Sequence, residues 1–469
     1  MMNRRQFLKA GTATAVAAGG AWAWPISTEA SRSSRRRSGS GRPRNVIVMV
    51  SDGMSSGTLS ITDQFLRWRD GRPSNWIKAY ELGEVTRGLM ETASLDNIVT
   101  DSAAAASAWG CGKRVNNGAV NLGPDGEPYE PILVTARRKG KATGLITTAT
   151  VTHATPAGFA ANIDRRWREG TIATQYVERE IDLLLGGGRR FFTSDRRGDG
   201  RDLVDEFKQL GHAYVEDRES LEALADAVPD RLLGLFAPNH LPFDVDRLNQ
   251  PELKARVPSL AEMLRAGLAV LDRRDQGFIL QVEGARVDHA AHANDIAGLI
   301  HDQVAFDDAI GVALAYAEQA GDTLVILCTD HGNANPGLSS GENGGDRNFQ
   351  ALSKIRASND GVFQAIGDQG EDREVVVDVL HEWTGQTYSE HELDSFQAAM
   401  ADTYRSPYYR MQGRSSVLGQ LIANHTDIGW VGHEHTSDHV ELAAYGPGRE
   451  AVKAFTLNTD LYDMMRMAL

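Results

Sequence analysis

The chain has 469 residues, of which 41% are hydrophobic and 24% charged, and it carries a formal net charge of −14. This composition excludes an intrinsically disordered protein, and the length suits one large domain or a main domain with insertions. Charge is unevenly distributed, since residues 45–469 hold 40 Lys and Arg against 62 Asp and Glu. An acidic body disfavours nucleic acid and anionic membranes as partners, although bound metal ions would still allow it to attract anions locally.

The N-terminus has the pattern of an export signal. Residues 3–9 read "NRRQFLK", with the paired arginines Arg4 and Arg5, and a mildly apolar stretch rich in Ala, Gly and Thr covers residues 10–24. This pattern predicts a twin-arginine signal peptide over residues 1–30 and not a stable membrane anchor, because the apolar stretch is short and contains three glycines. We therefore expect the twin-arginine export machinery as a partner and a periplasmic or secreted location.

A linker and a large domain follow the signal. Residues 31–44, "SRSSRRRSGSGRPR", cannot form a core and predict a linker before a folded domain over residues 45–469. The two cysteines, Cys111 and Cys328, lie in apolar segments. Their setting favours buried thiols, although export would permit a disulfide. The absence of a Cys-x-x-Cys pair excludes a thiolate zinc site.

Short apolar runs alternate with helical patterns along the domain. We predict strands at 46–50, 144–146, 278–282, 323–328 and 440–445, and helices at 258–274 and 296–320. This alternation is typical of an α/β fold with a central, mostly parallel β-sheet flanked by helices on both faces. The segment at about 342–427 lacks strong strand runs and predicts an inserted, mixed or helical, cap-like segment.

Acidic residues directly follow three of the predicted strands. Asp52 follows the first, Glu283 the third, and Asp330 with His331 the fourth. In open α/β sheets, ligands bind beyond the carboxyl ends of the strands, where distant loops converge. A single Asp after a strand is common in turns. Three acids at one edge of the sheet predict a shared site.

Further acid and histidine residues have the spacing of metal ligands. Asp288 and His292 are four residues apart, so on a helix both would point to one face, where they would either bind an ion or be solvated. His433, His435 and His439 precede the last predicted strand. Three histidines within seven residues are unusual for a surface loop, but this pattern alone does not choose the ligand.

One acid and one hydroxyl stand before an alanine run. Residues 100–112, "TDSAAAASAWGCG", predict a short helix that begins near Ser102 and ends at one of its glycines. Two interpretations are open. Asp101 or Ser102 is an ordinary N-cap of this helix. Alternatively, the positive end of the helix binds an anion and favours ionisation of the Ser102 hydroxyl to an alkoxide.

The segment at 151–166, "VTHATPAGFAANIDRR", offers two more groups of interest. The hydroxyl of Thr155 suits a hard cation, and Arg166 is able to bind two oxygens of a tetrahedral anion. The alternative is a capped helix followed by a surface arginine.

Taken together, six segments carry a family resemblance. "SDGM", "TDSAAAASAWGCG", "THATPAGFAA", "VEGARVDHAAHAND", "CTDHG" and "EHTSDHVELAAYGPG" are similar, in order and context, to segments of alkaline phosphatases, and the match spans Asn45 to Pro447. The resemblance implies a catalytic domain over 45–469 that hydrolyses small phosphomonoesters through a phosphoserine intermediate. It also implies two Zn²⁺ and one Mg²⁺ per subunit, and it suggests a homodimer.

The resemblance assigns the metal ligands position by position. Asp52 resembles the carboxylate that bridges a zinc and the magnesium, and Thr155 and Glu283 resemble the remaining protein ligands of the magnesium. The implied zinc ligands are Asp330 and His331 for the zinc that activates the nucleophile, and Asp288, His292 and His435 for the second zinc.

The resemblance also assigns the groups that act on phosphorus. Ser102 resembles the nucleophile, and Arg166 the phosphate-binding arginine, with Arg165 as the alternative. His153 and His289 replace an acid and a lysine of some relatives and resemble the histidines of others. The region after His331, up to residue 427, departs from the bacterial prototype, which leaves substrate range and subunit contacts undetermined.

Two other functions compete with this one. A phosphodiesterase or sulfatase would belong to the same superfamily, but sulfatases resemble a Cys/Ser-x-Pro-x-Arg pattern, whereas Cys111 is followed by Gly-Lys-Arg and Ser102 by alanines. An exported, non-catalytic phosphate- or metal-binding protein would not need a nucleophile aligned with three cation sites.

Overall fold

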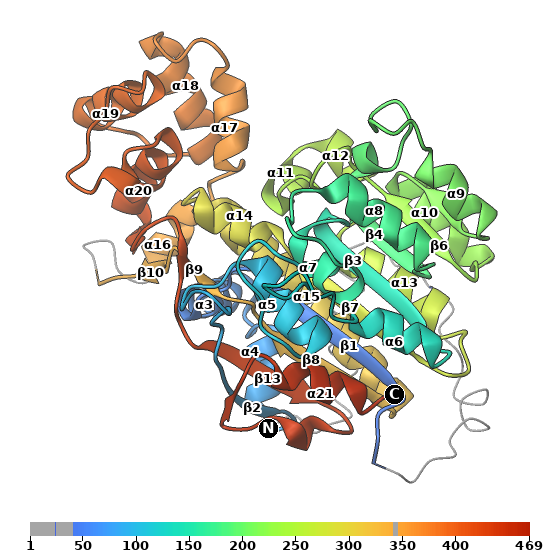
Figure 1. Cartoon of the computed structure of the whole chain (residues 1–469). Helices are drawn as coiled ribbons and strands as arrows, with labels where there is room; N and C mark the ends of the chain where they lie inside the picture. Colours follow the sequence, from blue (N-terminus) through green and yellow to red (C-terminus); the bar gives the residue numbers. More distant parts are fainter. Residues whose placement is uncertain (1–23, 25–40, 341–345) are drawn as a thin grey trace.

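The computed structural model describes residue 24 and residues 41–340 and 346–469 (Figure 1). Of the predicted signal and linker it includes only Trp24 and residues 41–44, so these two predictions lie outside the described residues. Within the described ranges, no helix combines the length and the apolar character needed to cross a membrane.

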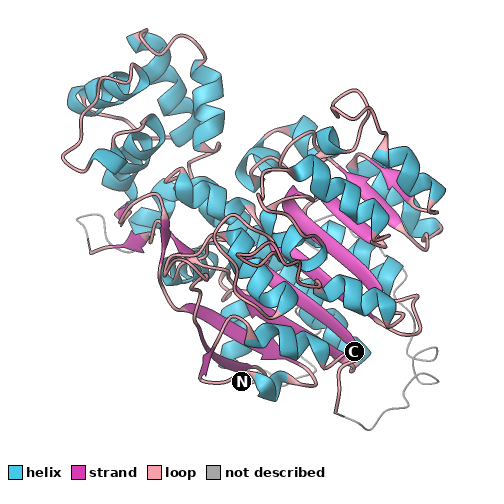
Figure 2. Cartoon of the chain, in the orientation of Figure 1, coloured by secondary structure: helices cyan, strands magenta, loops and turns pink. Residues whose placement is uncertain are grey.

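A ten-stranded sheet forms the centre of the molecule (Figure 2). Its strands, in spatial order, are β14 (Phe455–Thr456), β2 (Thr86–Met90), β13 (Val440–Tyr445), β8 (Thr323–Cys328), β1 (Asn45–Ser51), β7 (Phe278–Gly284), β3 (Ala142–Thr150), β4 (Leu183–Gly187), β6 (Leu232–Leu235) and β5 (Ala213–Val215). Only β13 runs antiparallel to its neighbours in this sheet. The predicted fold class is therefore confirmed.

Helices pack on both faces of the sheet, and they bury its central strands on both sides. Alternate side chains of β1 point to opposite faces: Val48 belongs to one apolar cluster and Ile47 to the other. The first cluster includes residues of α5 (Ser102–Cys111), α6 (Ile132–Arg138), α7 (Ala154–Ala160), α8 (Glu169–Glu178), α9 (Leu203–Gln209) and α21 (Asp460–Arg466). The second includes residues of α3 (Ser56–Asp70), α4 (Asn75–Glu81), α10 (Arg218–Ala223), α13 (Leu260–Leu271) and α15 (Ile296–Ala320).

Five strands of the ten-stranded sheet were not predicted: β2, β4, β5, β6 and β14. β4 reads "LLLGG" and β6 reads "LLGL". Leucine and glycine runs lack the β-branched and aromatic residues that distinguish a strand from a helical segment. β5 and β14 have only three and two residues, which is too short for any periodicity to appear.

The described part of the predicted insertion is helical. It contains α16 (Asp346–Leu352), α17 (Asn359–Ile366), α18 (Arg373–Thr384), α19 (Glu390–Met400) and α20 (Arg414–Thr426), with no strand among its described residues 346–427. Helices α17–α20 form a lobe at the upper left of Figure 1, away from the sheet. The third apolar cluster joins this lobe to α3 and to α14 (Arg286–His292) through Phe65, Val287 and Phe396. The domain boundaries and the cap role stay predictions.

The smaller elements lie around the edges of the sheet. Two short helices, α11 (Asp244–Asn249) and α12 (Pro251–Arg256), follow β6. Two-stranded sheets pair β9 (Gly332–Asn333) with β12 (His435–Thr436) and β10 (Gly337–Leu338) with β11 (Ile428–Gly429). Both cysteines are buried and free, as expected.

Candidate active site

Strand register gathers the predicted acids at one edge of the sheet. Val50 of β1 pairs with Glu283 of β7 and with Cys328 of β8, so the three strands end side by side. Asp52 follows immediately after β1, and Asp330 lies two residues after β8. The antiparallel β13 begins next to the end of β8. The loop before β13 lies at the same edge of the sheet, because β12, which precedes that loop, pairs with β9, which follows β8.

Helix α5 presents Ser102 to this edge. Asp101 is the N-cap and accepts a hydrogen bond from the backbone N–H of Ala104, and Ser102 is the first helical residue. The Oγ atom of Ser102 lies 3.2 Å from Nε2 of His331. The predicted N-cap is therefore confirmed at Asp101, whereas the role of Ser102 as a nucleophile stays a prediction; the helix ends at Gly112 in the left-handed conformation, as expected.

Small residues bring α5 and α7 together. A Cβ atom on Gly110 would lie 1.8 Å from the carbonyl oxygen of Gly158 in α7, so the two backbones touch where neither residue has a side chain. This close packing fixes α5, which begins at Ser102, against α7, which has Thr155 in its first turn, and the alanine-rich sequences of both helices allow it.

The first group of metal-ligand type contains Asp52, Asp330 and His331. Nε2 of His331 lies 3.1 Å from Oδ2 of Asp330 and 3.6 Å from Oδ1 of Asp52, and all three side chains are fully buried. The backbone N–H of Gly53 donates to the other oxygen of Asp330. Ser102 adjoins this group through His331.

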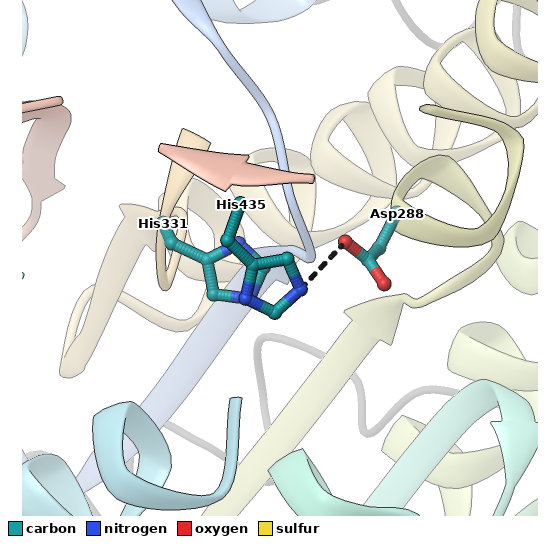
Figure 3. A group of neighbouring side chains, drawn as sticks. All are labelled: Asp288, His331 and His435. Atoms are coloured by element: carbon teal, nitrogen blue, oxygen red, sulfur yellow. Dashed lines mark ion pairs between the residues drawn. The ribbon is translucent and has the colours of Figure 1, made fainter. Parts of the chain in front are cut away.

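The second group contains Asp288, His292 and His435. Nε2 of His292 lies 3.0 Å from Nε2 of His435 and 3.5 Å from Oδ2 of Asp288, and Nε2 of His435 lies 3.7 Å from Oδ1 of Asp288. Figure 3 shows this last ion pair, with the ring of His331 stacked on that of His435 at 3.7 Å between centroids. His331 therefore adjoins both groups.

Backbone carbonyls orient the two histidines of the second group. Nδ1 of His435 lies 2.9 Å from the carbonyl oxygen of Thr100, and Nδ1 of His292 lies 2.7 Å from that of His433. Because a carbonyl only accepts, each Nδ1 carries the proton and each Nε2 has a free lone pair. Two such lone pairs that face each other beside a carboxylate fit a bound cation.

The third group contains Asp52, His153 and Glu283, and Thr155 belongs to the same edge of the sheet. Among the described residues, no hydrogen-bond partner is found for either carboxylate oxygen of Asp52, for Oε1 of Glu283 or for the hydroxyl of Thr155, although all are buried. Buried polar atoms normally have partners. These unpaired oxygens fit a hard, oxygen-preferring cation such as magnesium.

Electrostatics also indicate that positive charge belongs in the site. Burial, together with the charges of Asp330, Asp288 and Glu283, raises the pKa of Asp52 well above its usual value. Burial raises the pKa of Glu283 to about 7. Although burial opposes it, the adjacent His331 lowers the pKa of Asp330. Cations at this edge would relieve the repulsion among the four acids.

Arg166 lies in the site and Arg165 does not. Nη1 of Arg166 lies 3.1 Å from Oδ2 of Asp101, and its Nη2 lies 3.1 Å from Nε2 of His153. Arg165 is exposed, with its guanidinium carbon 5.6 Å from the centre of the Trp167 ring. The geometry therefore favours Arg166 as the phosphate ligand.

Several residues of the site had no signal in the sequence. His240, in the loop after β6, lies 4.5 Å from His289 and 5.7 Å from His153 between ring centroids. Nδ2 of Asn333 donates to Oδ1 of Asp288, and Arg286 lies 2.8 Å from Nδ1 of His289. Each is an isolated residue with no spacing pattern.

The other two histidines of the predicted cluster have different surroundings. His433 contributes its backbone carbonyl, which accepts from His292. His439 is exposed and its ring packs against Phe455. Of the three histidines, His435 alone belongs to a metal-ligand group among the described residues.

Comparisons with known proteins point to one family. The alkaline phosphatase family model matches residues 43–469. Alkaline phosphatase 4 of Bacillus subtilis is 32% identical over 457 residues, which cover 96% of this chain and 93% of that protein. The repressible alkaline phosphatase of Saccharomyces cerevisiae is 31% identical, over 90% of this chain and 79% of that protein. The crystal structure of Thermus thermophilus alkaline phosphatase superposes with a TM-score of 0.84 at 34% identity and covers 91% of both chains.

Proposed function

Because the chain belongs to the alkaline phosphatase family and is a phosphomonoester hydrolase that uses divalent metal ions, we propose that it acts through a phosphoserine at Ser102 with two Zn²⁺ and one Mg²⁺ per subunit. The observation that carries this proposal is the position of Ser102. Its hydroxyl stands at the N-terminus of α5, 3.2 Å from His331 and beside three groups of metal-ligand type.

The ligand sets combine these groups with the family resemblance. Asp330 and His331, with Asp52, would hold one zinc. Asp288, His292 and His435 would hold the second. Asp52 and Glu283, with the unpaired hydroxyl of Thr155, would hold the magnesium. When bound, such ions help to ionise a serine hydroxyl and neutralise charge on phosphoryl and leaving oxygens.

The chain's own residues would then carry the phosphoryl transfer. Oγ of Ser102 attacks phosphorus in line as the ester P–O bond breaks and the alcohol leaves. Arg166, held by Asp101, donates N–H groups to the phosphoryl oxygens, and the positive end of α5 faces the same charge. Water then attacks the phosphoserine, which releases inorganic phosphate and returns a proton to Oγ.

A substrate panel tests the reaction class. We expect p-nitrophenyl phosphate to be hydrolysed with a far higher kcat/KM than bis-p-nitrophenyl phosphate or p-nitrophenyl sulfate. These three share one leaving group, so the comparison isolates the recognition of the transferred group. Preference for the diester or the sulfate would reassign the chain within the superfamily.

His153 is expected to make activity depend on added magnesium. A neutral imidazole beside Asp52 and Glu283 supplies no negative charge, and magnesium keeps several of its waters, so the ion should be held weakly. Dialysis should therefore lower activity while zinc stays bound, and added magnesium should restore it. Changing His153→Asp should lower the magnesium concentration for half-maximal activity about tenfold.

Activity against magnesium concentration in zinc-replete enzyme measures this effect. His439→Asp provides the matched control, because His439 is exposed and belongs to none of the three groups. A flat curve for the parent enzyme, or the same curve for parent and His153→Asp, would show that His153 does not control the third metal.

We also propose export by the twin-arginine route to the periplasm or the medium. Replacing Arg4 and Arg5 by lysine should leave active enzyme in the cytoplasm, because the receptor reads the arginine pair. Cell fractionation with an activity assay measures this result. The double change Arg35→Lys and Arg36→Lys, in the predicted linker, is the control and should be exported. Export of the Arg4/Arg5 variant at the parent level would refute the signal.

The homodimer suggested by the resemblance is a further proposal. Apolar side chains are exposed where β2 and β14 form one edge of the sheet, namely Leu89, Phe455 and Leu457. Exposed apolar surface at a sheet edge favours association with another chain. Light scattering should give the mass of two chains, and a concentration-independent single-chain mass would contradict the proposal.

A further inference from the structure

Four apolar side chains are much more exposed than any other among the described residues. Four large hydrophobic residues are more than 60% exposed, whereas the next is 50% exposed: Ile98 (73%), Val431 (68%), Tyr409 (66%) and Trp167 (64%). Exposed apolar side chains that gather in one place indicate a binding surface. All four belong to segments that adjoin the active site, and we refer to them as the rim.

Trp167 adjoins the arginine of the site. It directly follows Arg166 in the chain, and the backbone N–H of Arg166 donates to the carbonyl oxygen of Gly118. The Trp167 ring passes over the same glycine, 3.9 Å from the point where a Cβ atom would stand. Backbone contacts thus fix Trp167 beside the phosphate-binding group.

Ile98 is held next to the nucleophile's helix. The side chain of Asn117 donates to the carbonyl oxygen of Val99 and accepts from the backbone N–H of Asp101. These two bonds fix the segment that runs from Ile98 to Asp101, the N-cap of α5, three residues after it. Asn117 also immediately precedes Gly118, so Ile98 and Trp167 belong to one side of the site.

Val431 and Tyr409 belong to the other side. Val431 lies four residues before His435, whose Nδ1 contacts the carbonyl oxygen of Thr100 on the Ile98 segment. Arg410, next to Tyr409, has its Nη1 4.0 Å from Glu434. The two sides therefore meet at the contact between His435 and Thr100.

Solvent reaches the site on the side of the rim. Ser102, Asp52 and His331 are buried, whereas the side chains of Arg166, His435 and His292 are 21%, 17% and 35% exposed. A phosphomonoester with phosphorus at Ser102 must direct its alcohol outward past these partly exposed residues. Trp167 directly follows Arg166 in the chain, and Val431 lies four residues before His435.

We propose that the rim binds the alcohol portion of the substrate and makes the enzyme prefer phosphomonoesters with apolar or aromatic leaving groups. This inference rests on the proposed function, because it assumes that phosphate binds at Ser102. Each methylene that the rim removes from water contributes to binding, and Trp167 and Tyr409 add flat aromatic faces. Hydrophilic alcohols, such as sugars and glycerol, gain nothing from these side chains.

A series of n-alkyl phosphates tests the rim. Ethyl, butyl and hexyl phosphate have leaving groups of nearly equal acidity, so their kcat/KM values report contacts with the chain. We expect kcat/KM to rise about two- to fourfold per methylene, the upper value corresponding to full burial. Trp167→Ser and Tyr409→Ser should each flatten the rise. Val377→Ser, on α18, is the control, since Val377 is also exposed but lies in the distal lobe.

The outcomes separate the rim from the proposed function. If all three esters are hydrolysed equally well, or if the rim variants keep the full rise, the rim proposal is overturned and the phosphomonoesterase proposal stands. If no ester is hydrolysed by metal-replete enzyme, the proposed function itself fails. If light scattering shows a dimer that Trp167→Ser and Tyr409→Ser dissociate, the rim is an interface between two chains and the substrate proposal is overturned.

Discussion

Replacing Ser102 by alanine is expected to lower kcat at least about a thousandfold while leaving the fold and the metal content intact. The change removes the only atom that would form the bond to phosphorus. It should cost little stability, because Ser102 begins an alanine-rich helix, and because Nε2 of His331, which its hydroxyl contacts, would be satisfied by the bound metal ion. The measurements are kcat with p-nitrophenyl phosphate and metal content after gel filtration.

Ser107 offers a matched control within the same helix. It is also fully buried, but its hydroxyl donates to the carbonyl oxygen of Ala103 and accepts from the backbone N–H of Asn121. Ser107→Ala should therefore reduce stability by about 1–3 kcal/mol, because it leaves a buried donor unpaired, and keep most of the activity. Turnover near the parent level in folded, metal-replete Ser102→Ala would show that another group receives the phosphoryl.

The sequence predicts the position of the site because strand ends are encoded locally. Asp52, Glu283 and Asp330 each follow or end an apolar run, and parallel register then aligns the three runs. Asp288 and His292 are likewise predicted by a spacing of four residues, which α14 realises. For these residues, a short-range sequence pattern is sufficient to predict a place in the site, together with the rule that ligands bind beyond the carboxyl ends of parallel strands.

The sequence does not predict two kinds of group in the site: backbone carbonyls from distant segments that orient the histidines, and single side chains that belong to no spacing pattern. The carbonyls of Thr100 and His433 orient the imidazoles of His435 and His292, yet any residue at either position supplies a carbonyl. His240 reaches the site from the loop after β6 with no spacing pattern to mark it. The choice of His435 among three histidines came from the family resemblance and not from the pattern itself.

Removal of the divalent metal ions is expected to abolish activity, with kcat/KM falling at least about a thousandfold, and also to destabilise the protein increasingly as pH rises. The loss of activity follows because the cations that would help to ionise the Ser102 hydroxyl are gone, and the acids around it repel a phosphate dianion. The destabilisation follows because Asp52, Glu283, Asp288 and Asp330 lie together in a buried site.

The pH dependence has a definite sign. In the metal-free protein, burial raises the pKa of Glu283 to about 7, against an ordinary value of 4.5. Protonated Glu283 therefore stabilises the fold below about pH 4.5, and this contribution, about 3 kcal/mol, is lost as pH rises towards and through 7. Asp52 acts in the same direction, since its pKa is also raised. Bound cations favour the ionised carboxylates, so the metal-replete protein avoids this loss.

Thermal unfolding of chelated and metal-replete protein at pH 5.5 and pH 8 measures the difference. The gap in Tm between the two forms should be larger at pH 8, and re-addition of zinc and magnesium should close it and restore activity. Glu283→Gln is the matched variant: its amide does not titrate, so its metal-free form should lose less stability between the two pH values than the metal-free parent. An equal gap at both pH values, or full activity after verified metal removal, would mean that the buried acids do not hold catalytic cations.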